Sequence, residues 1–484
     1  MPSHPGRNPA TATALLAVAL LLPSGRAAAS GAGDERPVIT SHELRLAAGP
    51  LRYTAEAGRI ALMDSARGTP RGFIFYVAYR VDVRRTVRPV TFVWNGGPGA
   101  NSLRLHLEGL GPRRVAGSRT VDNDATLLGA TDLVFVDPIG TGFSRAATAA
   151  DGARFYSTTG DLEATAEFVS RWRAQHKAAQ APVYLAGESY GSWRAAAVAE
   201  RLGLGGEPVA GIILISGGCP VGPLQPPETI TALRVPAWAA TALYHGVLDG
   251  GATAKRDSIL ASAERWASGR YAPALTRLAA LTPAERDTIA WELGRRIGIV
   301  PDSIPRGTLA LTLRQYRESL LRGHGAPLNL FDMRLTGATP PLPSEPILRY
   351  LRDELGVRIA LPYRDLEPDS TAGYRVGSIN QNWNYDTASP ADMAAAATGD
   401  GPPGARPWVL GALEHNPGLR VFVAAARYDS FGRCSANEDL ATRLPAEIAG
   451  RFTFRCYESG HMIGGDDEAR PKLAADLSAF LTGR

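Results

Sequence analysis

The amino-acid sequence predicts an α/β fold with a mostly parallel central sheet and helices on both faces. Short apolar runs alternate with helical patterns through the first half of the chain, and two more apolar runs lie near the C-terminus. Strands that are apolar throughout, rather than in alternate positions, are typical of parallel sheets buried on both faces. The length of 484 residues accommodates one large domain, or a core with an insertion.

The expected strands of the first half follow one another in a regular order. A helical pattern separates the third run from the fourth, and a second helix, ending near Arg201, follows the fourth run. Such alternation of strand and helix favours a parallel sheet. The apolar runs lie at residues 73–79, 90–94, 132–137, 182–186 and 211–216, and the first helical pattern lies at 159–177.

The pattern changes after Gly217. The following residues show helical periodicity broken by prolines, without a clear buried strand, from about 228 to 355. Thr282 followed by Pro283 indicates a helix N-cap with proline at the first helical position. Strand patterns return later, and a helix ends the chain. These elements are expected at 419–426, 451–457 and 468–481, and the predicted division is a core at 38–216 and 373–484 with a helical cap insertion at 217–372.

The N-terminus has the pattern of a secretory signal peptide. Arg7 supplies a positive charge, residues 12–22 form an apolar stretch too short to span a bilayer, and three alanines at 27–29 offer a cleavage site. We therefore expect residues 1–29 to be removed and the mature protein to be exported, without stable membrane association. The alternative is an uncleaved N-terminal anchor.

The charge and the cysteine content of the chain indicate which partners, cofactors and disulfides to expect. The net charge is +5 and no lysine or arginine run exceeds two residues, so no nucleic-acid partner is expected. Three cysteines form no disulfide framework, but Cys434 and Cys456 flank the candidate acid and histidine described below, and we predict a disulfide between them. Cys219 is then a buried free thiol. The chain has no zinc-protease or paired-cysteine motif, so neither a metal nor an organic cofactor is expected.

The candidate nucleophile is Ser189, within Gly-Glu-Ser-Tyr-Gly at residues 187–191. This segment follows an apolar run and precedes a helix-forming run, the context of a nucleophile elbow. The helix N-terminus places positive potential at the serine. The alternative is an ordinary strand-to-helix turn.

A histidine and an acid follow the serine in the order that an α/β-hydrolase requires. Asp429 comes after one expected strand and His461 after the next. In this interpretation His461 is the general base and then the general acid, and Asp429 orients the imidazole. Asp386 and Asp466 are the alternatives for the acid, although Asp466 follows the histidine and breaks the order.

A glycine-rich turn at residues 94–99 supplies the remaining parts of the predicted site. The backbone N–H groups of Gly97 and Tyr190 are the expected oxyanion donors. Glu188 directly precedes the nucleophile, where an ionised carboxylate would repel an oxyanion. A protonated Glu188, together with Asn95 and the Gly96 N–H, instead suits recognition of a substrate carboxylate. The alternative is a buried structural carboxyl group.

These motifs resemble those of the serine carboxypeptidases, α/β-hydrolases that act at acidic pH. The resemblance rests on four ordered segments, at residues 94–99, 137–144, 187–191 and 460–462. It implies the triad Ser189, Asp429 and His461, oxyanion donors Gly97 and Tyr190, a carboxylate clamp of Asn95, Gly96 and Glu188, and a cap that shapes specificity.

The sequence departs from the family at the clamp. Many members have a second glutamate before Leu-Gly-Pro, where this chain has Gly109, with Glu108 one residue earlier. The leading hypothesis is an exported serine carboxypeptidase that acts on peptides with a free C-terminus through an acyl-enzyme on Ser189. One rival is an esterase or acyltransferase with the same triad, and another is a binding protein on an inactive hydrolase scaffold.

Overall fold

The computed structural model describes residues 36–46, 49–81, 87–221, 226–249, 253–368, 376–397, 406–431 and 433–483. The chain divides into Met1–Glu35 and Arg36–Arg484, and the predicted signal peptide, 1–29, lies outside the described residues. Among the helices that are described, none is long and apolar enough to cross a membrane.

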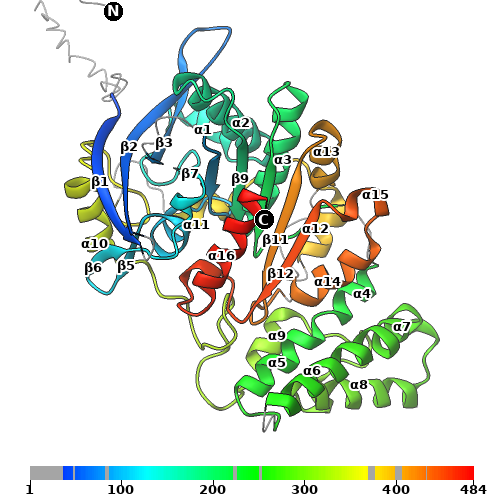
Figure 1. Ribbon diagram of the computed structural model, residues 1–484. Helices are drawn as coiled ribbons and strands as arrows, with labels where there is room; N and C mark the ends of the chain where they lie inside the picture. Colours follow the sequence, from blue (N-terminus) through cyan, green and yellow to red (C-terminus); the bar gives the residue numbers. More distant parts are fainter. Residues whose placement is uncertain are drawn as a thin grey trace, which may run out of the picture. The chain divides into compact units, whose positions relative to one another are not determined.

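A large twisted sheet forms the centre of the second unit (Figure 1). Its strands lie in the order β1-β2-β3-β7-β4-β9-β10-β11-β12, and β8 pairs with β3. The strands from β7 to β12 are parallel, whereas β1, β2 and β3 pair in antiparallel fashion and β3 is antiparallel to β7. The strands are β1 (Val38–Leu46), β2 (Gly49–Met63), β3 (Pro70–Val81), β4 (Val90–Trp94), β7 (Asp132–Val136), β8 (Arg145–Ala146), β9 (Val183–Glu188), β10 (Gly211–Ile215), β11 (Arg420–Ala426) and β12 (Phe452–Tyr457).

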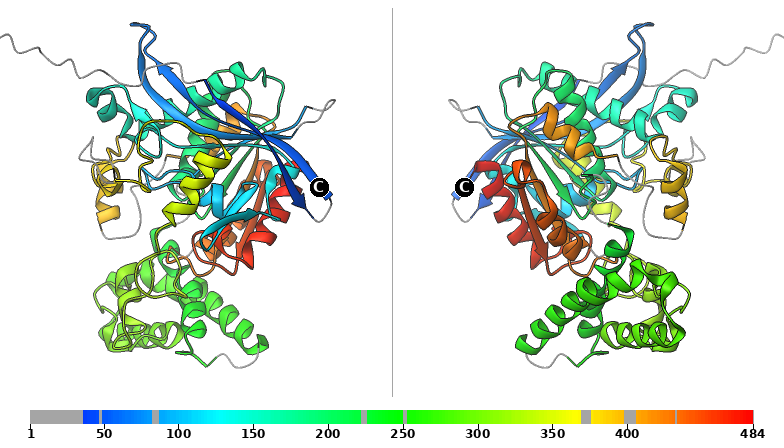
Figure 2. Two further views of the ribbon diagram at one scale, coloured as in Figure 1. Left: turned by 90° about the vertical axis from the view of Figure 1, so that its left-hand side faces the viewer. Right: turned by 90° about the vertical axis from the view of Figure 1, so that its right-hand side faces the viewer.

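Helices cover both faces of this sheet, which gives the α/β-hydrolase fold (Figure 2). One apolar cluster joins one face to α2 (Thr158–Gln175), α3 (Tyr190–Leu204) and α13 (Trp408–His415). A second cluster joins the other face to α16 (Ala469–Thr482) and α10 (Ser344–Arg349). Every residue of β4 and β10 is buried, as expected for strands covered on both sides. The predicted α/β fold is therefore confirmed.

A helical cluster with its own apolar core follows β10. Its buried residues run from Ala232 to Met333. Thr282 caps α8 through a capping box with Glu285, as the Thr-Pro pattern predicted. No strand occurs within the described residues of this block. Its helices are α4 (Pro227–Ala232), α5 (Val235–Tyr244), α6 (Thr253–Trp266), α7 (Ala272–Thr276), α8 (Pro283–Ile297) and α9 (Leu313–Ser319).

The packing divides the chain differently from the expected insertion at 217–372. Ile347, Tyr350 and Leu351 are buried in the second sheet cluster and not in the helical cluster. The reason is that α10 and the turn after it lie against the sheet, where they face buried strand residues such as Tyr79, whose hydroxyl bonds that of Tyr350 (2.8 Å). A helical pattern alone does not reveal which core a helix joins.

The remaining elements are short; those between residues 267 and 303 belong to the helical block, and the others connect elements of the core. The strands β5 and β6 form a separate antiparallel pair. These elements are β5 (Arg113–Ala116), β6 (Arg119–Asp122), α1 (Ala149–Phe155), α11 (Val376–Gln381), α12 (Pro390–Ala397), α14 (Arg433–Arg443), α15 (Ala446–Ala449), the π-helical turns η1 (Leu105–Leu110), η3 (Ala267–Tyr271) and η6 (Tyr350–Glu354), and the 3-10 turns η2 (Leu127–Gly129), η4 (Leu278–Ala280), η5 (Pro301–Ser303) and η7 (Ile463–Gly465).

Candidate active site

Ser189 stands on a strained turn between β9 and α3. Its backbone has φ 59° and ψ −127°, a conformation that costs a non-glycine residue free energy and is common at functional sites. The Ser189 N–H donates to the Ile215 carbonyl (2.9 Å), which fixes the turn to the neighbouring strand β10. The turn closes tightly, since a Cβ atom at Gly187 would lie 1.9 Å from the Gly191 oxygen. Ser189 therefore has the backbone geometry of a nucleophile elbow.

His461 and Asp429 meet in the loops after β12 and β11. The His461 Nδ1 atom and the Asp429 Oδ2 atom are 2.7 Å apart. Both residues are buried, at 3% and 0% exposed, so this pair is shielded from solvent. The two alternative acids are engaged elsewhere, because Asp386 accepts from the Thr159 N–H (3.0 Å) and Asp466 binds Arg334 (2.7 Å).

A segment from the end of the helical block braces both loops, a feature that the sequence did not reveal. We call residues 328–334 the bracing segment. The His461 N–H donates to the Phe331 carbonyl (2.6 Å), and the Met333 N–H donates to the Tyr428 carbonyl (2.8 Å). The Ser430 hydroxyl donates to the Leu330 carbonyl (2.6 Å). The loops that carry the acid and the histidine are thus tied to one short stretch of backbone.

The glycine-rich turn after β4 packs directly on the elbow. The Trp94 indole N–H donates to the Gly191 carbonyl (2.9 Å). A Cβ atom at Gly96 would lie 2.5 Å from the Tyr190 nitrogen, so only glycine permits this approach. Gly97 has φ 99°, a conformation that also favours glycine. The turn therefore brings the Gly97 and Tyr190 backbone to one side of Ser189, where oxyanion donors are needed.

Glu188 and Asn95 form a buried pair next to the nucleophile. The Asn95 Nδ2 atom donates to the Glu188 Oε1 atom (2.6 Å), and both side chains are 4% exposed. Burial raises the pKa of Glu188 to about 7, against smaller lowering effects of the His461 and Arg104 charges. The carboxyl group is consequently protonated at acidic pH and is then able to donate a hydrogen bond.

Asn95 is itself held from two sides. Its Oδ1 atom accepts from the Leu105 N–H (3.1 Å), and its carbonyl accepts from Arg194 (2.8 Å). Arg194 is fully buried and forms two hydrogen bonds with Asp161 (2.8 and 3.2 Å). These contacts fix the orientation of the Asn95 amide toward Glu188.

The predicted site residues surround one pocket of about 760 Å³. Its walls contain the candidate nucleophile, base, oxyanion donors and clamp, whereas Asp429 lies buried behind His461. Apolar side chains line much of the rest. The predicted residues at the wall are Asn95, Gly96, Gly97, Glu188, Ser189, Tyr190 and His461, and the apolar ones include Leu313, Leu330, Phe331, Leu342, Leu366 and Phe431.

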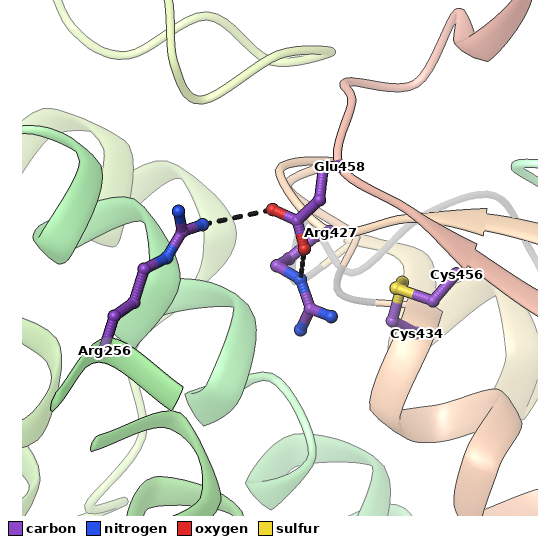
Figure 3. Close-up of a disulfide and its surroundings, with 5 residues drawn as sticks. All are labelled: Arg256, Arg427, Cys434, Cys456 and Glu458. Atoms are coloured by element: carbon purple, nitrogen blue, oxygen red, sulfur yellow. Dashed lines mark hydrogen bonds and ion pairs between the residues drawn. A yellow bond between two sulfur atoms is a disulfide. The ribbon is translucent and has the colours of Figure 1, made fainter. Parts of the chain in front are cut away.

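The two predicted disulfide partners are bonded in the structure (Figure 3). Cys434 lies in the first turn of α14 and Cys456 in β12, so the bond joins the segments that follow Asp429 and precede His461. Beside it, Glu458 forms ion pairs with Arg427 and with Arg256 of α6, the latter at 3.1 Å. Cys219 is a free thiol in a partly buried residue that packs against the first apolar cluster, and burial raises the pKa of its thiol.

Comparison with known proteins finds one family match, in the first part of the core. Residues 63–203 match the family described as serine carboxypeptidase, a range that contains the glycine turn and Ser189. This region is therefore similar to the serine carboxypeptidase family. No curated protein matches the chain significantly.

Similar solved structures include an acetylester hydrolase from Corynebacterium glutamicum, with 13% identity, a TM-score of 0.36 and coverage of 92% of this chain and 96% of that one. A carboxyl esterase from Bacillus coagulans has 14% identity, a TM-score of 0.34 and coverage of 88% and 98%. A hypothetical protein from Pseudomonas aeruginosa has 16% identity, a TM-score of 0.37 and coverage of 88% and 99%.

The arrangement has the parts that acyl transfer requires. Ser189 lies at a helix N-terminus beside glycine backbone, and His461 is oriented by Asp429 at the wall of the same pocket. A serine so placed attacks a carbonyl carbon while the imidazole takes its proton, and backbone N–H groups stabilise the oxyanion. This chemistry cleaves esters and peptides alike, so the other side chains of the pocket determine the class of substrate.

Proposed function

We propose that this protein is a serine-type carboxypeptidase that releases the C-terminal residue of peptides through an acyl-enzyme on Ser189. The observation that carries the proposal is the buried Asn95–Glu188 pair in the same pocket as Ser189 and His461. A protonated Glu188 and the Asn95 amide offer hydrogen bonds to a carboxylate, which an enzyme for neutral esters does not need. The family match over residues 63–203 supports the same proposal.

In this mechanism the free C-terminus anchors the substrate. The clamp of Asn95, Gly96 and Glu188 holds the carboxylate, which places the last peptide bond against Ser189. His461 accepts the serine proton and returns it to the leaving amine, and Asp429 stabilises the imidazolium. Water then releases the acyl group, with His461 acting again as base.

The test compares an N-blocked dipeptide with its C-terminal amide at about pH 5, where Glu188 is protonated. Wild-type protein should cleave the free acid much faster than the amide, and Ser189→Ala should lose this activity while remaining folded. Equal rates on acid and amide, or ester turnover without peptide cleavage, would overturn the proposal.

An esterase or acyltransferase that uses Ser189 is the second candidate. The apolar wall of the pocket, which includes Leu313, Leu330 and Leu342, favours it because such a wall accommodates an acyl chain. For this function the blocked and free C-termini should react alike, so the same experiment separates the two candidates.

Export of the protein remains a proposal as well. The apolar N-terminal stretch at residues 12–22 supports it, and the Cys434–Cys456 disulfide is of a kind that persists in oxidising compartments. Fractionation of the native host and N-terminal sequencing of the mature chain test it, with residue 30 as the expected first residue.

A further inference from the structure

A positively charged side chain lies beside the proposed carboxylate clamp. Arg104 lines the pocket together with Asn95, Glu188 and Ser189. The next backbone N–H, that of Leu105, donates to the Asn95 Oδ1 atom (3.1 Å), which ties the Arg104 backbone to the clamp. The Arg104 charge also opposes the rise in the pKa of Glu188. A carboxylate held by the clamp is therefore within the field of this cation.

Arg104 is fixed in place but keeps donors for a ligand. Its Nη1 atom donates to the Glu108 carboxylate (3.0 Å) and its Nη2 atom to the Pro340 carbonyl (2.9 Å). The side chain is 28% exposed. A guanidinium group has five N–H donors, and the others have no acceptor among the residues that the structure describes. The group is thus oriented by the protein while part of it faces the pocket.

We propose that Arg104 binds the C-terminal carboxylate of the substrate directly, as a cationic member of the clamp. This inference rests on the proposed function and refines it. A guanidinium–carboxylate contact joins charge to hydrogen bonding and needs no protonated partner.

The charged groups around Arg104 are consistent with this role. Glu108 lies one helical turn later and neutralises the guanidinium in the free protein. In the adjoining pocket the Arg334 side chain pairs with both Asp332 and Asp466 at 2.7 Å, so those two carboxylates already have a cation. His461 faces the same space from the loop after β12. A substrate carboxylate would therefore be the second anion bound by Arg104, after the carboxylate of Glu108.

The proposal must be separated from a purely structural Arg104–Glu108 ion pair. The chain offers a matched control, since Glu108→Gln removes the same ion pair but leaves the cation. We would measure inhibition of p-nitrophenyl acetate hydrolysis by N-acetylphenylalanine and by its amide, in wild type, Arg104→Gln, Arg104→Lys and Glu108→Gln. The measured signal is hydrolysis of the ester, which involves no peptide cleavage. The result therefore does not depend on the proposed peptidase activity.

The expected result is selective loss of carboxylate binding. Arg104→Gln should raise the inhibition constant of the free acid about tenfold or more, at acidic and at neutral pH, because a charge-assisted hydrogen bond is lost. Arg104→Lys should restore part of the affinity, Glu108→Gln should not weaken it, and the amide should bind all four proteins alike.

Two results would overturn the inference. Equal weakening in Arg104→Gln and Glu108→Gln, on acid and amide together, would make the ion pair structural. An Arg104→Gln protein that binds the free acid as wild type does at low pH, but keeps that affinity to a higher pH, would show that Arg104 only lowers the pKa of Glu188. Arg104-dependent binding of the acid without peptide cleavage would retain the inference and reject the carboxypeptidase function.

Discussion

The titration of Glu188 offers the sharpest prediction for catalysis. Burial raises the pKa of this carboxyl group from 4.5 to about 7, which corresponds to roughly 3 kcal/mol against its ionised form. Below this pKa the group is neutral and donates to the substrate carboxylate. Above it the group is an anion that repels both the substrate carboxylate and the oxyanion. Peptidase activity should therefore fall as the pH rises through the pKa.

The size of the effect follows from the fraction of neutral carboxyl group. With a pKa of about 7, that fraction falls about tenfold between pH 6 and pH 8. The ratio of kcat/KM for the free-acid dipeptide to kcat/KM for its amide should fall by the same factor. Glu188→Gln keeps a neutral donor and the Asn95 bond at every pH, so its ratio should stay level over this range.

The assay measures kcat/KM for the free-acid and the amide substrate in parallel. A change in the protonation of the catalytic base affects both substrates and therefore cancels in their ratio. Hydrolysis of an uncharged ester by the same proteins is the control for folding, and Glu188→Gln should retain it. A Glu188→Gln protein whose ratio still falls about tenfold would refute the assignment of this pH dependence to Glu188.

Three further predictions concern the geometry of the site. Gly96→Ala should lower kcat about 10²–10³-fold, because its Cβ would lie 2.5 Å from the Tyr190 nitrogen and would displace that oxyanion donor. Gly129→Ala, with nothing within 4 Å, is the control, and normal activity of Gly96→Ala would contradict the oxyanion role of the Tyr190 N–H. Asp429→Asn should lower kcat by about 10³–10⁴-fold without changing the melting temperature by much, and a loss of only a few fold would point to another acid. Cys434→Ser should lower the free energy of unfolding in urea by about 3 kcal/mol, and an unchanged midpoint would show that the disulfide adds no stability.

The centre of the sheet was predictable from sequence because its strands are apolar throughout. The run at 90–94 matches β4, and those at 182–186 and 211–216 match β9 and β10 to within two residues. The antiparallel strands β1 and β2 were not predicted. Exposed and partly buried residues alternate along β1, and charged residues such as Arg52 and Glu56 interrupt β2, so neither has the signature of a buried strand.

The candidate site was predictable where a local motif fixes the backbone. The elbow at Ser189 and the glycine turn at 94–99 are continuous segments, and strand order alone places Asp429 and His461 at one edge of the sheet. Arg104 was not predictable as a pocket residue. Its position at the pocket is held by the Pro340 carbonyl, 236 residues away in the chain, and no periodicity or spacing encodes such a contact.

The bracing segment shows why the helical block cannot be regarded only as a determinant of specificity. Residues 328–334 belong by sequence to the expected insertion, yet their backbone accepts from the His461 N–H and donates to the Tyr428 carbonyl. The two loops that it joins follow two adjacent parallel strands, β11 and β12, and each loop is short. The 2.7 Å contact between His461 and Asp429 therefore depends on packing between the block and the core, since displacement of this segment would release both loops together. Phe331 lines the pocket, and its ring centroid lies 5.1 Å from that of His461. A substrate that contacts Phe331 would in this way be linked physically to the orientation of the base.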